Sequence, residues 1–339
     1  MEIKELSANG HERLVSCTDG DYHGLIAIHN THLGPAIGGS RFWQYQNEQE
    51  AIVDVLRLAR GMTYKNALAG VPFGGGKSII LKNDGPIDRE KIFRTHGRFV
   101  ETFGGRYITA EDVGTSPADM EHIRKETQHV AGLMSGSGDP SPVTARGVFR
   151  AMQAAAKYRW GVDSLAGRTV AIQGCGNVGY YLASYLHADG ARLIASDVDA
   201  AKVERVVQEF GATAIAPPEI YAVEADVFAP CALGGVINDQ TVHSLRVEIV
   251  AGGANNQLLE PRHGNELAAR NILYTPDYAA NSGGVINGCR DLLGWDSTQS
   301  AAKVDEIYDT VLNIFEIAAA EGIPTYKAAD RLAEARFQS

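Results

Sequence analysis

The sequence has no excess of basic residues, and this absence limits the partners that it can have. Its 31 Lys and Arg residues are outnumbered by 41 Asp and Glu residues, which gives a formal net charge of -10. Nucleic-acid binders usually present a basic surface, and an acidic membrane surface repels an acidic chain. We therefore expect small molecules and other copies of the chain as partners, with no nucleic acid and no membrane.

Cysteine is also scarce, and the chain has no long apolar run. Cys17, Cys175, Cys231 and Cys289 are widely separated and form no C-x-x-C pair. This spacing is typical of reduced thiols in a cytoplasm, not of a disulfide framework or a cysteine zinc site, so we expect no metal. The opening residues MEIKELSANGHERL have no apolar core of the signal-peptide kind, and no stretch is long and apolar enough to span a membrane. These features predict a cytoplasmic protein.

The length and the order of sequence patterns predict an α/β protein of two domains. The chain has 339 residues, enough for about two domains. The turn-rich stretch SGSGDPSPVTARG, residues 135–147, is the best candidate for the crossing between them. We therefore expect domains over 1–140 and 141–320, followed by a helical tail over 321–339.

Strand and helix patterns are mixed before the crossing and alternate after it. Residues 24–29 read as a strand, and NEQEAIVDVLRLARG reads as a helix with Asn47 and Glu50 as a capping box and Gly61 as its break. A second helix is expected over 88–103. After the crossing, the short apolar runs TVAIQ, RLIASD, DVFAPCA, EIVAGGA and ILYTPDY predict a parallel sheet with helices on its faces.

The strand TVAIQ leads directly into GCGNVG, residues 174–179, which opens an amphipathic helix. This context is typical of a dinucleotide-binding loop: Gly174 permits the turn, Gly176 admits the pyrophosphate and Gly179 lets the helix pack closely. Asp197 lies at the end of the next strand, where a carboxylate binds the ribose hydroxyls and repels a 2′-phosphate. We therefore expect a Rossmann-type domain that binds NAD in preference to NADP.

The stretch AGVPFGGGKS, residues 69–78, resembles a phosphate-binding loop but departs from its pattern. The strict pattern G-x-x-x-x-G-K-[ST] needs a glycine where Val71 stands. Lys77 is preceded by Lys65, and Asp112 ends a predicted strand. Two lysines and an aspartate among glycines suggest an amino acid site, in which one lysine pairs with the α-carboxylate and the other, with a lowered pKa, acts as a base.

Five stretches occur in order across most of the chain: LGPAIGGSR, GMTYKNALAGVPFGGGK, YITAEDVGT, GCGNVG and AGGANNQL. Together they resemble the glutamate/leucine/phenylalanine/valine dehydrogenase family, in its leucine-type members above all. The resemblance implies an N-terminal domain for substrate binding and oligomerisation, a C-terminal NAD domain, and a cleft between them. It also implies reversible oxidative deamination of an L-amino acid to a 2-oxo acid and ammonia.

The resemblance implies a role for each matching residue. Lys65 would bind the substrate carboxylate with the backbone of Gly38 and Gly39, Lys77 would activate water, and Asp112 would exchange protons with the amino group. The three glycines before Lys77 would let substrate and nicotinamide approach the backbone. Asn256 would lie near substrate and nicotinamide, and Thr144 and Asn255 beside the nicotinamide. The remaining cofactor positions would be Gly174, Cys175, Gly176, Asn177, Val178, Gly179, Tyr180 and Asp197.

The resemblance also bears on the substrate side chain. Glutamate-specific members carry a lysine where this chain has Ile37, so we expect an apolar substrate, leucine or another branched-chain amino acid first. Ala110 and Val285 match apolar pocket positions. Gly288 departs from the pattern, because relatives carry a bulkier residue there, and this leaves phenylalanine or another aromatic substrate open.

Two other functions and the oligomeric state also remain open from the sequence. A phosphate-binding-loop hydrolase and a catalytically silent NAD-binding regulator are the competing functions. Leucine-type relatives that form octamers commonly extend further at the C-terminus. An octamer needs two kinds of subunit contact, and the shorter end is expected to remove part of one, so we expect a homodimer.

Overall fold

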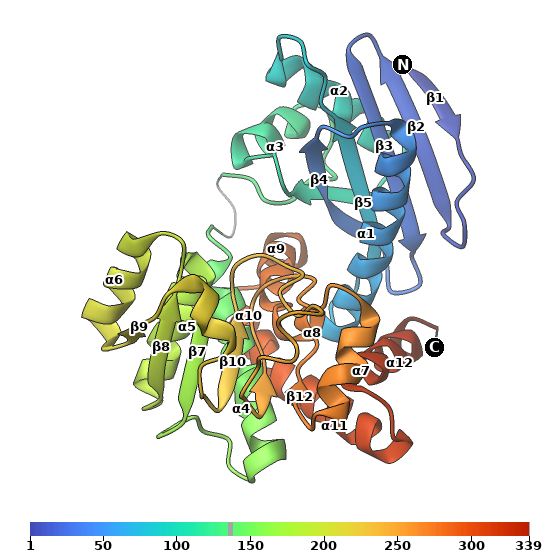
Figure 1. Ribbon diagram of the computed structural model, residues 1–339. Helices are drawn as coiled ribbons and strands as arrows, with labels where there is room; N and C mark the ends of the chain where they lie inside the picture. Colours follow the sequence, from blue (N-terminus) through green and yellow to red (C-terminus); the bar gives the residue numbers. More distant parts are fainter. Residues whose placement is uncertain (135–137, 339) are drawn as a thin grey trace. The chain divides into compact units, whose positions relative to one another are not determined.

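The computed structural model describes residues 1–134 and 138–338 (Figure 1). The first part of the predicted crossing, Ser135 to Ser137, lies outside the described residues. The chain divides into two compact units. The first unit comprises Met1–Gly138, Gly288–Trp295 and Ala333–Ser339, and the second comprises Asp139–Asn287 and Asp296–Leu332.

The first unit contains a mixed six-stranded sheet in the order β1-β2-β3-β5-β4-β6. Strands β1, β2, β3 and β5 run antiparallel to their neighbours in that series, whereas β4 is parallel to both β5 and β6. The strands are β1 (Glu2–Glu5), β2 (Arg13–Asp19), β3 (Tyr22–Asn30), β4 (Ala36–Trp43), β5 (Gly74–Leu81) and β6 (Tyr107–Glu111).

Helices cover both faces of this sheet, because successive strand residues point to opposite faces. Leu25 and Ala27 of β3 pack with α1 (Glu48–Ala69) in one apolar cluster. Ile26 and Ile28 pack in a second cluster with α2 (Arg89–Glu101) and α3 (Pro117–Arg124). The sheet therefore has an α1 face and an α2 face.

Helix α1 corrects one prediction from the sequence. It begins after Asn47, whose side chain accepts a hydrogen bond from the Glu50 N–H, as expected. However, it runs through Gly61 and ends only at Gly70, in the left-handed conformation at φ 64°. Gly61 is exposed. A helical glycine costs about 1 kcal/mol relative to alanine, and the buried contacts on either side of it, at Ala59 and Thr63, offset that cost.

The C-terminal residues belong to the first unit and pack on the end of α1. Arg336, near the end of α12 (Thr325–Gln338), donates hydrogen bonds to the carbonyls of Ala67 and Leu68 at 2.9 and 3.0 Å. Carbonyls in the last turn of a helix lack partners within the helix, and a cation there is favourable. The last turn of α1 has no basic residue of its own, so Arg336 supplies this charge.

The second unit contains a parallel six-stranded sheet in the order β12-β11-β10-β7-β8-β9. All five predicted strands after the crossing are present, and this order is that of a Rossmann-type fold. The strands are β7 (Thr169–Gln173), β8 (Arg192–Ser196), β9 (Thr213–Ala214), β10 (Val227–Pro230), β11 (Ile249–Val250) and β12 (Leu273–Tyr274). The two-domain α/β fold expected from the sequence is thereby confirmed.

Helices alternate with these strands and continue to the end of the chain. They are α4 (Ser141–Trp160), α5 (Asn177–Ala188), α6 (Ala200–Phe210), the 3₁₀ helix η1 (Pro217–Tyr221), α7 (Pro261–Ala269), α8 (Asp277–Ala280), α9 (Gly283–Leu293), α10 (Ser297–Asp305) and α11 (Ile307–Glu321). Over residues 1–134 and 138–338, none of the helices combines the length and apolar character that crossing a membrane requires.

Candidate active site

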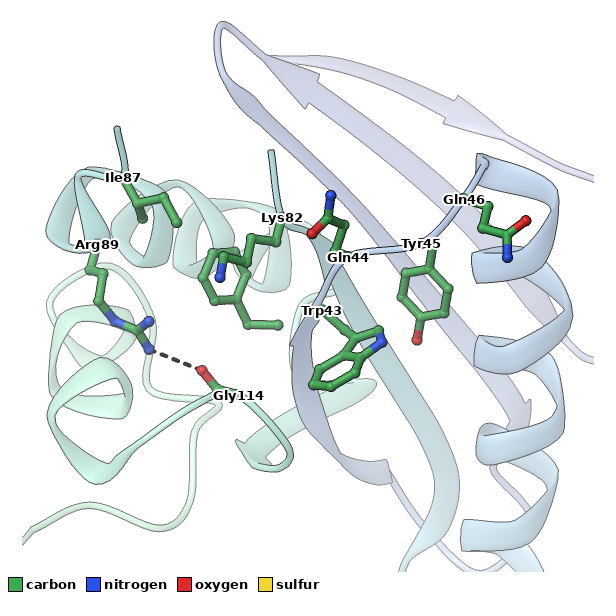
Figure 2. Close-up of a pocket in the computed structure, with 9 residues that line it drawn as sticks. Trp43, Gln44, Tyr45, Gln46, Lys82, Ile87, Arg89 and Gly114 are labelled. Carbon is green, nitrogen blue, oxygen red and sulfur yellow. Dashed lines mark hydrogen bonds between the residues drawn. The ribbon is translucent and has the colours of Figure 1, made fainter. Parts of the chain in front are cut away.

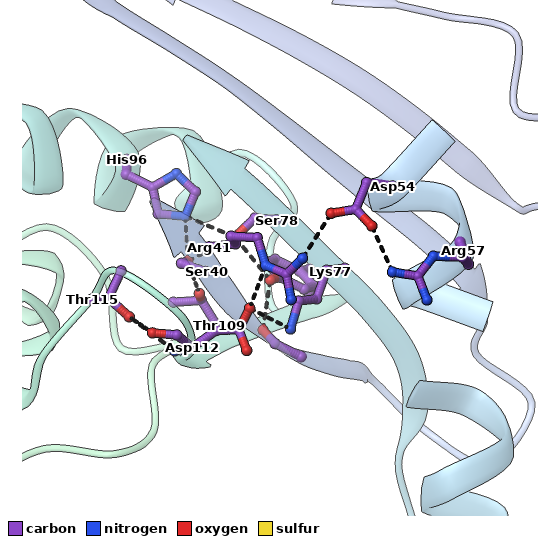
Figure 3. A network of polar contacts seen from close by, with 12 residues as sticks. Ser40, Arg41, Asp54, Arg57, Lys77, Ser78, His96, Thr109, Asp112 and Thr115 are labelled. Atoms are coloured by element: carbon purple, nitrogen blue, oxygen red, sulfur yellow. Dashed lines mark hydrogen bonds and ion pairs between the residues drawn. The ribbon is translucent and has the colours of Figure 1, made fainter. Parts of the chain in front are cut away.

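Lys77 and Asp112 meet on the α1 face of the first sheet. Lys77 lies inside β5 and Asp112 directly follows β6, and their charged groups are 3.0 Å apart (Figure 3). Lys77 is 5% exposed, which is unusual for a lysine without a carboxylate partner. The sequence placed these two residues at one site, and the structure brings them together.

Burial and neighbouring charges change the pKa of both groups. Burial lowers the pKa of Lys77, and the attraction of Asp112 opposes this shift without cancelling it. Burial alone would raise the pKa of Asp112, but Lys77 and Arg41 together outweigh it and hold that pKa below its ordinary value. The arrangement favours an ionised carboxylate beside a lysine that gives up its proton more readily than usual.

The alternation of β4 places the other predicted substrate residues on the same face. Ile37 and Gly39 lie on β4 with Arg41, and Ala110 lies opposite Gly39 on β6. A Cβ on Gly39 would come within 2.7 Å of the Asp112 Cβ, so this glycine admits the aspartate. Gly38 points to the α2 face, where its carbonyl accepts a hydrogen bond of 2.7 Å from the Tyr107 hydroxyl.

Lys65 lies on α1, above the same strands. It is half-buried, and it follows Thr63 by two residues. A Cβ on Gly75 would come within 2.1 Å of the Thr63 backbone nitrogen, so α1 and β5 are in close contact there. Lys65 is therefore carried on the helix that packs directly against the strand of Lys77.

The three glycines before Lys77 have a packing role that the sequence did not predict. We expected them to make room for substrate and nicotinamide, but protein atoms occupy the space beside each one. An added Cβ would approach the Asn30 carbonyl at Gly74, the Thr63 backbone at Gly75 and the Tyr107 ring at Gly76, at 2.0, 2.1 and 2.8 Å. On the side where each Cβ would lie, the glycines allow close packing within the protein.

The structure also excludes a phosphate-binding loop at AGVPFGGGKS. Such a loop joins a strand to the N-terminus of a helix, where free backbone N–H groups face the phosphate. Here Gly74 to Leu81 form a strand whose backbone pairs with both β3 and β4. Lys77 and Ser78 lie in the interior of the sheet, on its opposite faces.

The sequence reasoning missed Arg41 as a member of the site. Its Nε donates to Asp112 Oδ2 at 3.1 Å, and its Nη1 donates to Asp54 Oδ2 at 2.8 Å. Arg41 is the last residue of the quoted stretch LGPAIGGSR, two positions after the expected Gly39. Residues two positions apart in a strand point to the same face of the sheet. If β4 had been predicted as a strand, Arg41 would have been placed on the face of Gly39.

A buried polar network lies on the α2 face beneath these residues. Ser40 contacts the hydroxyls of Ser78 and Thr109 at 2.7 and 2.5 Å, and its hydroxyl lies 2.8 Å from His96 Nε2. Burial lowers the pKa of His96 to about 3, so its ring is neutral and bonds as a neutral imidazole. This network joins β4, β5, β6 and α2, and it fixes the strands that carry Arg41 and Lys77.

In the second unit, GCGNVG forms the turn between β7 and α5. Gly174 has φ 97°, a conformation that favours glycine, and a Cβ on Gly179 would lie 1.9 Å from the Gly174 carbonyl. Beside Gly176, by contrast, an added Cβ would meet no atom within 4 Å. The structure thus provides open space at the N-terminus of α5, where backbone N–H groups favour an anion.

Asp197 lies just after β8 and reaches this loop. Its Oδ2 accepts a hydrogen bond from the Cys175 N–H at 2.7 Å, and its Oδ1 accepts one from the Asp199 N–H at 2.9 Å. The carboxylate is therefore fixed at the edge of the glycine loop. The loop residues Asn177, Val178 and Tyr180 form the first turn of α5.

The remaining predicted positions are distributed over the second unit and α9. The Thr144 hydroxyl donates to the Pro140 carbonyl at 2.9 Å, and Asn255 accepts a hydrogen bond from Asn281 at 2.7 Å. Asn256 has φ 52°, which asparagine tolerates better than most residues. Val285 and Gly288 lie on α9; the first belongs to the second unit and the second to the first.

Asp239, His263 and Glu266 form a group whose ligand atoms lie within 4.8 Å of one another. Arg262 already pairs with both carboxylates of this group. His263 Nδ1 accepts the Glu260 N–H, which leaves its proton on Nε2, toward Asp239 at 3.0 Å. A bound metal would need that nitrogen without its proton, so these contacts oppose metal binding.

A pocket lies elsewhere in the first unit, at the end of β4 (Figure 2). Its volume is about 550 Å³, and its lining includes Trp43, Tyr45, Lys82 and Arg89. Arg89 is already engaged there, since it donates to the carbonyl of Gly114 at 3.0 Å and pairs with Asp119. None of the predicted catalytic or substrate residues lines this pocket.

Comparison with known proteins agrees with this architecture. Residues 12–129 match the family described as "Glu/Leu/Phe/Val dehydrogenase, dimerisation domain", and residues 135–201 and 197–333 match "Glutamate/Leucine/Phenylalanine/Valine dehydrogenase". Leucine dehydrogenase from Geobacillus stearothermophilus is 50% identical, with 100% of this chain and 94% of the relative covered. Valine dehydrogenase from Streptomyces albus is 46% identical, with 97% and 92% covered.

Solved structures give the same result. The crystal structure of L-tryptophan dehydrogenase from Nostoc punctiforme has a TM-score of 0.89 and 45% identity, with 97% of this chain and 96% of that chain covered. The fold and the site thus define an NAD-dependent dehydrogenase that acts on amino acids. The chain belongs to the Glu/Leu/Phe/Val dehydrogenase family.

Proposed function

We propose that this chain catalyses the reversible oxidative deamination of apolar L-amino acids with NAD, with leucine and other branched-chain amino acids as its preferred substrates. The products are a 2-oxo acid, ammonia and NADH. The observation that best supports this proposal is the pair of Lys77 and Asp112, 3.0 Å apart and largely buried. Glycine and apolar residues, Gly39, Ile37 and Ala110, share their face of the sheet.

Each charged residue of the site has one task in this proposal. Lys65 pairs with the substrate α-carboxylate, and Asp112 exchanges a proton with the amino group. Lys77 takes a proton from the water that attacks the imine carbon of the oxidised substrate, and its positive charge then stabilises the carbinolamine. The lowered pKa of Lys77, caused by burial, suits a base that works near neutral pH.

The second unit suits the cofactor. Bound NAD would supply the acceptor for the hydride that leaves the substrate α-carbon. The turn from Gly174 to Gly179 would hold its pyrophosphate, because the space beside Gly176 is open and α5 begins there. Asp197 would accept hydrogen bonds from the ribose hydroxyls, and Thr144, Asn255 and Asn256 would lie at the nicotinamide end.

The substrate side chain is proposed to be apolar because of Ile37, which is 5% exposed. A buried carboxylate that faces isoleucine would have no partner, a cost of several kcal/mol. An aromatic amino acid is the second candidate. It is favoured by Gly288, where an added Cβ would meet no atom within 4 Å, and by the similarity to an L-tryptophan dehydrogenase.

A panel of L-amino acids tests this proposal, with NADH formation as the readout. We expect leucine, isoleucine, valine and norvaline to be oxidised, and glutamate to be inert. If kcat/KM is highest with phenylalanine or tryptophan, the second candidate, an aromatic amino acid, is the preferred substrate. NAD binding without any NADH formation would contradict both and identify a silent NAD-binding protein.

We also propose a homodimer. Residues 12–129 match a family model that is described as a dimerisation domain, and this supports a subunit contact in the first unit. Light scattering coupled to size exclusion checks this at micromolar protein. A mass of two chains supports the dimer, and a mass of eight chains contradicts it.

The four free thiols fit a reducing compartment, so we propose a cytoplasmic location.

A further inference from the structure

We propose that Arg41 is a positioning residue that holds the Asp112 carboxylate for proton exchange with the substrate amino group. This inference rests on the proposed function, because it assigns Arg41 a part in the same reaction. Arg41 pairs with Asp112, which it positions, and with Asp54 of α1, which holds Arg41 in place (Figure 3).

The side-chain contacts of Asp112 are made by one of its two carboxylate oxygens. Lys77 Nζ and Arg41 Nε both contact Oδ2, at 3.0 and 3.1 Å. Among the described residues, no hydrogen bond or ion pair of Oδ1 is seen. Two cations on one oxygen fix the rotation of the carboxylate, and Oδ1 is left for the substrate.

Arg41 is itself held on its other side. Its Nη1 donates to Asp54 Oδ2 at 2.8 Å, and the Tyr45 hydroxyl donates to the same oxygen at 2.7 Å. Arg57 donates to the other oxygen, Oδ1, at 2.8 Å. The guanidinium is thus fixed between a carboxylate of α1 and the carboxylate that follows β6.

An arginine suits this place better than a lysine would. Its planar guanidinium presents separate N–H donors in fixed directions, so one group can bond two carboxylates at once. A lysine would carry the charge on a single flexible nitrogen. Arg41 also lies on β4, which pairs with both β5 and β6, so its backbone is fixed relative to Lys77 and Asp112.

The charge of Arg41 affects both proton-transfer groups. Arg41 lowers the pKa of Asp112 and also lowers that of Lys77. Among the described residues, Asp54 raises the pKa of Lys77, and Glu111 lies beside Asp112. Without the Arg41 charge, both groups would hold their protons to higher pH.

The alternative is that Arg41 only stabilises the fold, as a salt bridge between β4 and α1. The pH profile distinguishes these roles. If Arg41 is purely structural, its substitution changes the folded fraction and leaves the pH dependence of the folded enzyme unchanged. If Arg41 is a positioning residue, its substitution lowers kcat and moves the acid limb of kcat/KM to higher pH. This is the direction in which the pKa values of Asp112 and Lys77 move when the Arg41 charge is lost.

Arg41→Met, Arg41→Lys and the matched control Arg57→Met test this. Arg57 also pairs with Asp54, but it does not contact Asp112 and is more exposed than Arg41. We expect Arg41→Met to lower kcat at least about tenfold and to shift the acid limb upward. Arg41→Lys should lower kcat with a smaller shift, because the charge remains. Arg57→Met should resemble wild type in both readouts.

The measurements are made on the full chain with its best substrate, and thermal unfolding checks the fold of each variant. If Arg41→Met does not fold, the inference is tested with Arg41→Lys alone. A kcat of Arg41→Lys equal to that of wild type would then overturn the inference. Identical pH profiles for Arg41→Met and Arg57→Met would overturn it as well. A wild-type protein that oxidises no amino acid would instead refute the proposed function, and this inference with it.

Discussion

The two units of the chain use glycine-rich segments of similar appearance in opposite ways. In the second unit, Gly176 lies in a turn before a helix, and the space beside it is open. In the first unit, Gly74, Gly75 and Gly76 lie inside a strand, and protein atoms fill the space beside each. The space beside a glycine is therefore open in one unit and filled by another part of the protein in the other.

This difference separates the tasks of the two units. The first unit supplies buried charges, held by tight packing between α1, β4, β5 and β6. The second unit supplies backbone N–H groups and a fixed carboxylate around an open turn. Substitutions should therefore damage chemistry and stability in the first unit, and cofactor affinity in the second.

The largest expected effect is at Lys77. Lys77→Ala removes the proposed base and leaves Asp112 without one of its two cations, so kcat should fall about a thousandfold or more. NAD affinity, measured by quenching of protein fluorescence, should stay near that of wild type because the second unit is unchanged. Near-normal kcat in this variant would refute the assignment of the site.

The next prediction compares the two kinds of glycine directly. Gly75→Ala places a Cβ 2.1 Å from the Thr63 backbone, so the free energy of unfolding should fall by about 2 kcal/mol or more. Gly176→Ala meets no protein atom within 4 Å, so its stability should stay within about 0.5 kcal/mol of wild type.

The same pair of variants should differ in cofactor affinity. Gly176→Ala should raise the KM for NAD, because the added methyl occupies space meant for the pyrophosphate. Thermal unfolding and NAD titration check both variants. The comparison between the units fails if Gly176→Ala destabilises the protein as much as Gly75→Ala does.

A smaller effect is expected at Asp197. Asp197→Ser removes the charge that repels a 2′-phosphate and weakens the bonds to the ribose. Since a hydrogen bond to a charged group contributes about 1.5–3 kcal/mol, kcat/KM with NAD should fall roughly tenfold. Activity with NADP should rise relative to NAD. Wild-type protein that uses NADP as well as NAD would show that Asp197 does not face the ribose.

The effect expected at Ile37 is confined to substrate selectivity, because only the substrate side chain is concerned. Ile37→Lys introduces a cation that can pair with a carboxylate, so glutamate should become a detectable substrate. Activity with leucine should fall about tenfold, because an apolar side chain would then face a desolvated charge. Initial rates with both substrates check this, and unchanged selectivity would remove Ile37 from the pocket.

Regular patterns made much of the fold predictable from the sequence. The five strands after the crossing were visible because parallel strands are short, apolar and bounded by turns. Helix α2 was visible from the spacing of its apolar residues, and the structure adds Asp88 as its N-cap. The break at Gly61 was wrong because packing on both sides of an exposed glycine outweighs its intrinsic cost.

The strands β4 and β5 were not predicted, and most of what the sequence missed in the site follows from this. Glycine has low strand propensity, so AIGGS and GGGKS read as turns. Their strand character depends on pairing with β3 and β6, which lie elsewhere in the sequence. Arg41 was overlooked for the same reason. The contact between Arg336 and the end of α1 likewise joins residues that no local pattern connects.

Oxidative deamination of an apolar amino acid is tested most directly by measuring all products of one reaction. Wild-type protein is incubated with L-leucine and NAD, and NADH, ammonia and the 2-oxo acid are quantified together. Oxidative deamination predicts equal amounts of the three products and no reaction when NAD is omitted. NADH formed without ammonia, or no NADH with any apolar amino acid, would contradict the account.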